Sequence, residues 1–298
     1  MRRTLPLFLL ALLLLLTACT AGTNQTTASL TTDAPTETPA DTASTESNEA
    51  AGEPFRVGME AGYPPFNWSQ LDDQNGAFKI DGSVEYAGGY DVEMAKLIAA
   101  GLNRPLVIVK TEWDGLGPAV ISGKIDAIIA GMSPTGERKE TLDFTDNYYE
   151  SEFVVIVRKD GEYANATSIE DFAGAKLSAQ LNTNHYPVID QIEGVSKQDA
   201  MDSFASLRMA LASGKIDGYV SERPEGNSVE AAMPELKMIR FAEGKGFEVE
   251  PSDIVVAVAV KKDSPLVAEI NAVLQTISLE TREQLMEDAI QNQPIAGD

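Results

Sequence analysis

The chain has 298 residues, and its 46 acidic residues outnumber its 23 Lys and Arg residues, which gives a formal charge of -23. A field this negative excludes nucleic-acid binding, which needs clustered cations, and it excludes a polybasic mode of membrane attachment. The single cysteine excludes an intramolecular disulfide, and 43% hydrophobic residues allow one large domain or two small ones.

The N-terminus predicts export. A basic Met-Arg-Arg start precedes an almost unbroken apolar run, which is the pattern of a secretory signal and is too short to favour a membrane span. Leu16-Thr-Ala-Cys19 resembles a bacterial lipobox. It predicts a lipoprotein signal peptide over residues 1–18 and a lipid, such as palmitate, on Cys19. The alternative is a free cysteine at the end of an ordinary signal.

Residues 19–53 are predicted to form a disordered tether. After Cys19 they consist mainly of Thr, Ala, Ser, Glu, Asp and Pro, with one Leu and no Lys or Arg. Such a segment buries too little apolar area to offset the chain entropy lost on folding.

Strands and helices are predicted to alternate through the rest of the chain. Strands are predicted at 55–59, 106–109, 124–130, 153–157, 176–179 and 254–260. One helix is predicted to begin at Asp91 as N-cap, with Met94, Leu97, Ile98 and Leu102 on one face. A short helix is predicted to begin at Ser168, with Asp171 in capping-box spacing. A final helix is predicted over the stretch that carries Leu266, Ile270, Val273, Leu274 and Ile277. This alternation predicts an α/β fold with parallel sheets covered by helices.

A repeated motif predicts two related lobes. Ser-Gly-Lys-Ile-Asp occurs at 122–126 and again at 213–217, each time after an apolar helical pattern and before a short apolar run. The two copies lie about ninety residues apart, which is too far for a solenoid repeat. We therefore expect two α/β lobes of similar construction.

Four groups of residues follow predicted strands, where ligands bind in such folds. They are Gly131, Met132, Ser133, Thr135 and Arg138; Glu222; Glu60, Tyr63 and Phe66; and Trp113. An arginine facing a carboxylate across a cleft suits a zwitterion such as an α-amino acid, because the guanidinium fork matches a carboxylate.

Each residue also has a structural interpretation. Arg138 could form surface ion pairs with Glu137 and Glu140, Glu222 could be a solvated loop carboxylate, and Tyr63 and Trp113 could be core aromatics. The sole histidine, His185, favours a structural role. Without a second histidine or a nearby cysteine it makes no metal site, and no Gly-x-Ser-x-Gly elbow accompanies it. We expect no catalytic residue, metal or cofactor.

The mature body, from Pro54 to about Gln291, resembles the type II amino-acid-binding proteins of bacterial ABC importers. The motifs that carry the resemblance are VGMEAGYPPF (57–66), GGYDVEMAKLIA (88–99), WDGLGPAVISGKIDAIIAGMSPTGERKETLDFTDNYY (113–149), LSAQLNTN (177–184), ALASGKIDGYVSERP (210–224) and AVAVKKDSP (257–265). The resemblance implies a two-lobed periplasmic-binding-protein-like fold with two Rossmann-like lobes. Lobe 1 would comprise 54–149 and 253–298, and lobe 2 would comprise 153–247, joined by a two-segment hinge near 149–152 and 246–252.

The resemblance also implies roles for individual residues. Arg138 and Ser133 would bind the ligand α-carboxylate, with the Gly131 backbone on the ammonium side, and Glu222 stands where the family usually has an ammonium-binding Asp. The other implied ligand-binding residues are Glu60, Tyr63, Phe66, Trp113, Met132, Gln180, Thr183 and Asn184. Asn182 replaces the usual Gly of its loop, and residues 69–87 are longer than the family's hairpin.

The function implied is capture of an L-amino acid, polar or basic, by lobe closure and its delivery to an ABC permease and its ATPase. We expect a monomer held by its N-terminal lipid at the outer face of the cell membrane, or in the periplasm of a Gram-negative host, with no nucleic-acid partner. The alternatives are a dehydratase-type enzyme with Glu222 as general acid, and a ligand-sensing module. The sensor would need a C-terminal membrane span, which the polar 291–298 stretch does not supply.

Overall fold

The computed structural model describes residues 52–294. The predicted signal, Cys19 and nearly all of the predicted tether lie outside the described residues. Within 52–294, no helix is long and apolar enough to cross a membrane.

The first sheet has five strands in the order β6-β1-β7-β14-β8. Its strands are β1 (Phe55–Met59), β6 (Leu106–Lys110), β7 (Ala127–Ile128), β8 (Leu142–Glu150) and β14 (Val255–Lys261). β6, β1 and β7 are parallel, whereas β14 is antiparallel to both β7 and β8. We call the part of the molecule built on this sheet the first lobe.

The second sheet also has five strands, in the order β11-β10-β12-β9-β13. Its strands are β9 (Phe153–Arg158), β10 (Lys176–Ser178), β11 (Ser196–Lys197), β12 (Gly218–Glu222) and β13 (Leu236–Ile239). β11, β10 and β12 are parallel, and β9 is antiparallel to its neighbours. The expectation of purely parallel sheets is therefore wrong, because hydrophobic periodicity does not encode strand direction. We call this part the second lobe.

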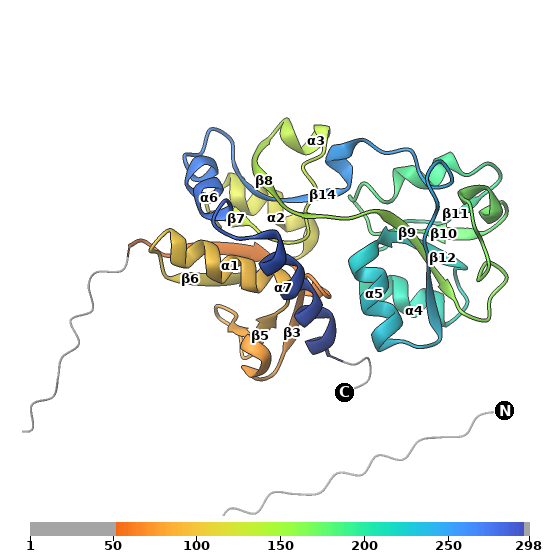
Figure 1. Cartoon of the computed structure of the whole chain (residues 1–298), viewed down its shortest axis with the longest axis horizontal. Coiled ribbons are helices and arrows are strands. Elements are labelled where there is room, and N and C mark those ends of the chain that lie inside the picture. The colour runs from red at the N-terminus through yellow and green to blue at the C-terminus, as the bar shows by residue number, and fades with distance from the viewer. Residues whose placement is uncertain (1–51, 295–298) are drawn as a thin grey trace, which may run out of the picture. The chain divides into compact units, whose positions relative to one another are not determined.

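Helices cover both sheets (Figure 1). The first lobe carries α1 (Tyr90–Gly101), α2 (Trp113–Ile121), α3 (Gly136–Lys139), α6 (Leu266–Leu274) and α7 (Leu279–Asn292), and the second carries α4 (Phe204–Ala212) and α5 (Arg223–Ala232). Single-turn 3-10 helices lie at Gln74–Gly76, Ile169–Phe172, Pro187–Gln191 and Pro251–Asp253. The capping box predicted for Ser168 and Asp171 is present.

The chain passes between the lobes twice. β8 leads into β9 through Ser151 and Glu152, and the chain returns from β13 to β14 through residues 240–254. In this return segment Phe247, Val249 and Ile254 pack against the core of the second lobe.

The start of α1 differs from the prediction. Gly89 is its N-cap, not Asp91. The buried Asp91 carboxylate instead accepts hydrogen bonds from the Tyr148 hydroxyl at 2.6 Å and from Asn67 Nδ2 at 2.7 Å. It is therefore committed to long-range contacts and unavailable as a cap. Leu97, expected on the buried face, is 38% exposed.

Two further elements differ from expectation. Of the strand predicted at 124–130, only β7 (Ala127–Ile128) joins the sheet, because residues 123–126 form the turn that follows α2. Helix α7 was not predicted, and of its residues only Met286 and Ala289 are buried. A helix with so narrow an apolar stripe leaves little periodic signal.

Residues 69–87, predicted to be longer than the family's hairpin, form part of a small third sheet. Its order is β2-β3-β5-β4, with β2 (Gly62–Tyr63), β3 (Asn67–Gln70), β4 (Phe78–Lys79) and β5 (Tyr86–Gly88). Ile80 forms a parallel bridge with Ile108 of β6. The segment thus extends the edge of the first lobe.

Candidate functional site

Arg138 lies at the boundary between the two lobes, which we call the seam. Thr135 caps α3 by accepting a hydrogen bond from the Arg138 backbone N–H at 3.3 Å. The guanidinium donates from Nη1 to the Ser133 carbonyl at 2.9 Å and from Nη2 to the Asn182 carbonyl at 3.2 Å. It also lies 5.1 Å from the ring centroid of Trp113, within cation–π range. These contacts, rather than surface ion pairs, fix the side chain.

Burial lowers the pKa of Arg138 from 12.5 to about 10, although Glu137 and Asp253 act in the opposite direction. The group therefore remains charged at neutral pH. A guanidinium has five N–H donors and two are used by carbonyl oxygens, so three remain to bind an anion.

Gly131, Met132 and Ser133 form the turn between β7 and α3. Gly131 has φ 63°, and a Cβ there would lie 3.0 Å from the Tyr63 ring. The position therefore needs glycine both for its backbone conformation and for the close approach of the ring. The Ser133 hydroxyl donates to the Asp253 carbonyl at 3.1 Å, while the Met132 carbonyl accepts from Ala257 at 3.0 Å.

Glu222 ends β12 and is the N-cap of α5, which has Pro224 in its first turn. It is 5% exposed, so the interpretation as a solvated loop carboxylate is wrong. The Tyr63 hydroxyl donates to its Oε1 at 2.7 Å. Burial raises the pKa of Glu222 from 4.5 to about 7, and the hydrogen bond from Tyr63 lowers it in part. Arg223, its sequence neighbour, pairs with Glu152 instead.

Glu60 and Gln180 meet across the seam from the ends of β1 and β10. Gln180 Nε2 donates to both carboxylate oxygens of Glu60 at 3.2 Å, and to the Asp202 carbonyl at 3.1 Å. Both side chains are buried. Burial raises the pKa of Glu60 from 4.5 to about 7, against the lowering effect of the Gln180 hydrogen bond.

The loop after Gln180 borders the site from the second lobe. Asn182 has φ 56°, a conformation that asparagine tolerates better than most residues. Thr183 Oγ1 donates to the Gln180 carbonyl at 2.7 Å, and Asn184 Nδ2 donates to the Asp253 carbonyl at 2.9 Å. The loop is therefore stabilised by a hydrogen bond within itself and by one to the return segment.

Aromatic rings line the two sides of the seam. Tyr63 stacks on Phe204 of α4 with ring centroids 4.2 Å apart, and on Phe66 at 5.2 Å. Phe66 itself is fully buried beneath Tyr63. Trp113, at the start of α2, faces Arg138 and donates from Nε1 to the Asn182 carbonyl at 3.2 Å.

These residues surround one small cavity. It is lined by Tyr63, Trp113, Gly131, Ser133, Arg138, Gln180, Thr183, Asn184, His185, Phe204 and Glu222. Of the predicted residues, Glu60, Phe66 and Met132 lie behind this lining. The enclosed volume is about 10 Å³, which is room for about one water molecule.

Two lining residues were not predicted. In the sequence, Phe204 belongs to an apolar pattern at helical spacing, which predicted only a core position. His185 was assigned a structural role, and its edge-on packing against Phe153 at 4.8 Å agrees with that role. Its Nδ1 is nevertheless buried without a hydrogen-bond partner among the described residues, and burial lowers its pKa from 6.5 to about 3. His185 therefore places a neutral imidazole at the cavity.

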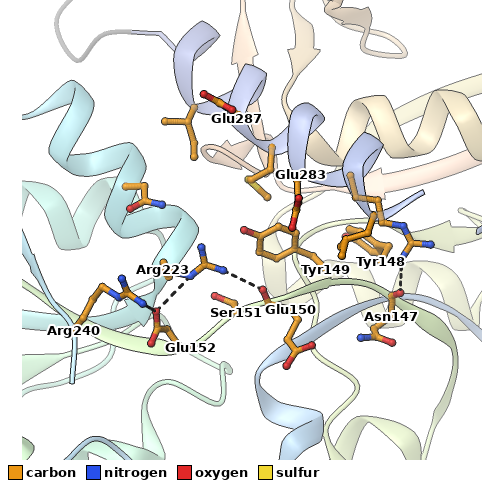
Figure 2. Close-up of a pocket in the computed structure, with 15 residues that line it drawn as sticks. Asn147, Tyr148, Tyr149, Glu150, Ser151, Glu152, Arg223, Arg240, Glu283 and Glu287 are labelled. Carbon is orange, nitrogen blue, oxygen red and sulfur yellow. Dashed lines mark hydrogen bonds and ion pairs between the residues drawn. The ribbon is translucent and has the colours of Figure 1, made fainter. Parts of the chain in front are cut away.

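A larger cavity of about 780 Å³ lies beside the β8–β9 crossover, and none of the predicted site residues lines it (Figure 2). Glu152 forms ion pairs there with Arg240 at 2.6 Å and Arg223 at 3.4 Å. Glu283 and Glu287 extend from α7 on the opposite wall. Within residues 52–294, no group of three or more His, Cys, Asp or Glu side chains is placed to hold a metal ion.

Comparison with known proteins identifies the architecture. A family model described as bacterial extracellular solute-binding proteins, family 3, matches residues 55–291. A probable histidine-binding protein of Campylobacter jejuni is 32% identical over 182 residues, which cover 61% of this chain and 65% of that protein. The L-arginine-binding protein of Pseudomonas aeruginosa is 27% identical, over 80% of this chain and 88% of its own length.

A solved structure gives the same result. The amino acid ABC transporter substrate-binding protein of Streptococcus pneumoniae, bound to L-arginine, has a TM-score of 0.70 and 26% identity, over 80% of this chain and 94% of that one. The fold is that of the type II periplasmic binding proteins. The family match spans both sheets and nearly all of the described chain, and the chain therefore belongs to the bacterial extracellular solute-binding proteins, family 3.

Proposed function

We propose that this protein captures an L-amino acid between its lobes and delivers it to an ABC permease driven by a cytoplasmic ATPase. The observation that carries the proposal is that Arg138 of the first lobe and Glu222 of the second lobe line one cavity. Arg138 would bind the α-carboxylate with its three free N–H donors, and Glu222 would bind the ammonium group. This pairing matches both charges of a zwitterion.

The side chain of the ligand would extend towards Glu60 and Gln180. Glu60 accepts hydrogen bonds from the Gln180 amide, so a guanidinium, ammonium or amide group could take the same place. An acidic side chain would face a second carboxylate. We therefore propose a basic or amide side chain, and the names of the relatives make L-arginine the first ligand to test.

Capture requires movement of the lobes. A cavity of about 10 Å³ cannot admit an amino acid, so the two walls must separate and close again around the ligand. In this proposal lobe 1 comprises residues 54–149 and 253–298, lobe 2 comprises 153–247, and the hinge lies near 149–152 and 246–252. Closure is a population shift that the ligand drives only through contacts it gains in the closed state.

The same proposal includes an N-terminal lipid. Lipidation of Cys19 would hold a monomer at the outer face of the membrane, with residues 20–53 as the tether. Mass spectrometry of the membrane-extracted protein tests this directly, and Cys19→Ser should release the protein into the medium.

Thermal melting of residues 54–298 against the twenty L-amino acids and their D-forms tests the binding function. A ligand that binds the folded state raises the melting temperature by mass action. We expect L-Arg, L-Lys or L-Gln to raise it selectively. No shift with any of them would reject the proposal.

Arg138→Ala should weaken L-arginine binding by roughly 2–5 kcal/mol, because it removes one partner of a buried charge-assisted pair. Isothermal titration calorimetry measures the loss. Arg240→Ala is the matched control, since the Arg240 side chain is 59% exposed and lines the other cavity. Equal affinity in the Arg138 variant and in wild type would rule out this assignment.

One observation bears on the enzyme alternative. Burial raises the pKa of Glu222 to about 7, which is the range of a general acid. We propose that the group binds an ammonium ion and does not transfer a proton. Incubation with L-arginine and prephenate, followed by mass spectrometry, should recover both unchanged.

A further inference from the structure

Asn182 makes three contacts with the first lobe at the mouth of the cavity. Its carbonyl accepts from Arg138 Nη2 at 3.2 Å and from Trp113 Nε1 at 3.2 Å. Its side chain donates from Nδ2 to Asp114 Oδ1 at 2.8 Å. Asn182 belongs to the loop after β10, whereas Arg138, Trp113 and Asp114 belong to α3 and α2. All three hydrogen bonds therefore cross from one lobe to the other.

We propose that Asn182 is a positioning residue that fastens the closed lobes at the rim of the site and aims the Arg138 guanidinium at the ligand. Below, the Asn182–Asp114 hydrogen bond is called the rim contact. The inference deepens the proposed function, since it assumes that closure accompanies ligand capture.

The backbone geometry of Asn182 explains how this residue can both connect the lobes and orient Arg138. At φ 56° the Asn182 carbonyl reaches the two first-lobe donors. Glycine adopts this conformation freely but has no side chain to make the rim contact. Asparagine keeps the conformation at little cost and adds an amide donor. The Asn182 side chain thus supplies a bond across the lobes that glycine could not.

The contact also affects what Arg138 presents to a ligand. The Asn182 carbonyl occupies one Nη2 donor and the Ser133 carbonyl occupies one Nη1 donor. Because both terminal nitrogens of the guanidinium are hydrogen-bonded, the orientation of its plane is fixed, and so are the directions of its remaining N–H groups. A ligand carboxylate then finds a prepared fork and loses less freedom on binding.

The rim contact lies between exposed side chains, so its effect should be modest and should appear mainly in the rate of ligand release. Asn182→Gly keeps the backbone conformation and removes only the side chain. Dissociation of L-arginine, followed by stopped-flow tryptophan fluorescence, should become about threefold to tenfold faster.

A hydrogen-bond swap gives the sharpest test. Asn182→Asp should release L-arginine faster than Asn182→Gly, because it places two carboxylates opposite each other. The double variant Asn182→Asp/Asp114→Asn restores one donor and one acceptor with their roles exchanged. Its release rate should return to within about twofold of wild type. Asn103→Gly is the control, since Asn103 is exposed and has a similar φ of 54°.

The outcomes separate this inference from the proposed function. If wild type binds L-arginine, then equal release rates in wild type and Asn182→Gly, or no rescue in the double variant, overturn the rim contact. If wild type does not bind L-arginine, the ligand proposal fails and the rim contact is tested by small-angle X-ray scattering. Asn182→Asp should then have a larger radius of gyration than wild type and the double variant, and equal radii overturn it.

Discussion

Glu60 and Glu222 are the two buried carboxyl groups at the candidate site, and burial disfavours the charged form of each. Each is under a tenth exposed, and burial raises the pKa of each from 4.5 to about 7. Their partners, the Gln180 amide and the Tyr63 hydroxyl, are neutral donors. Among residues 52–294, neither carboxylate forms an ion pair with a Lys or Arg side chain. A ligand ammonium at Glu222 would supply that cation.

Glu222→Gln should therefore stabilise the protein in a pH-dependent way. Because the folded-state pKa is raised, the folded wild type binds more protons than the unfolded chain between pH 4.5 and 7, and its stability falls as pH rises through that window. The amide variant does not titrate. We expect its advantage in the free energy of unfolding to grow from near zero at pH 4.5 to about 3 kcal/mol at pH 8. Urea denaturation at several pH values measures this, with exposed Glu243→Gln as control. A difference that does not vary with pH would contradict the account.

At the scale of elements, the repeated Ser-Gly-Lys-Ile-Asp motif forms the same helix-to-strand turn at 122–126 and at 213–217, and we call each turn a corner. After α2 and α4 the chain turns at Gly123 (φ 77°) and Gly214 (φ 75°). Each aspartate then accepts from a backbone N–H of the adjacent parallel strand: Asp126 from Arg56 at 2.8 Å, and Asp217 from Lys176 at 2.9 Å. Each aspartate also pairs with an arginine, Arg104 or Arg158 respectively. The motif therefore fixes where each helix joins its sheet.

Asp126→Ala and Asp217→Ala should destabilise the protein to a similar extent, by about 1–3 kcal/mol each, because each leaves a strand N–H without its acceptor and removes one ion pair. Their effects should add, since they lie in separate lobes. Chemical denaturation of the two single variants and the double variant measures this. Exposed Asp199→Ala serves as control, and a cost confined to one lobe would show that the two corners are not equivalent.

At the scale of the whole described body, α7 connects the lobes as well as covering the first one. The residue after it, Gln293, donates from Nε2 to the Ser228 carbonyl of α5 at 3.0 Å and also bonds to the Ser228 hydroxyl. Both residues are buried. The larger cavity lies between the same two helices and the β8–β9 crossover (Figure 2). The two lobes are therefore in contact at the small cavity lined by Arg138 and Glu222 and also beside the β8–β9 crossover.

Gln293→Ala should loosen this second attachment. We expect a loss of about 1–3 kcal/mol in the free energy of unfolding, since Ser228 loses its buried partner, and a larger radius of gyration in small-angle X-ray scattering. Gln291→Ala is the matched control, since Gln291 is exposed and lies two residues earlier, on α7. A variant with wild-type stability and radius would show that α7 does not restrain the lobes.

The sequence by itself determined the local elements and the family. β1, β6, β9, β10 and β14 were predicted nearly to their ends, because short apolar runs between Gly and polar residues carry their own signal. The matched Ser-Gly-Lys-Ile-Asp corners predicted two lobes. Arg138 and Glu222 were predicted as site residues because each lies at or after a strand end, where parallel α/β sheets place their ligand sites.

Only the tertiary structure decided what depends on contacts between distant residues. Strand direction, the hydrogen bonds of Asp91 with Tyr148 and Asn67, and the cavity position of Phe204 and His185 follow from packing between residues that are distant in the chain. Helix α7 follows from burial of one narrow face. The pairing of Glu60 with Gln180 joins residues 120 positions apart. Periodicity and capping are local signals, whereas burial, and with it the pKa of each site carboxyl, is set by what the second lobe places against the first.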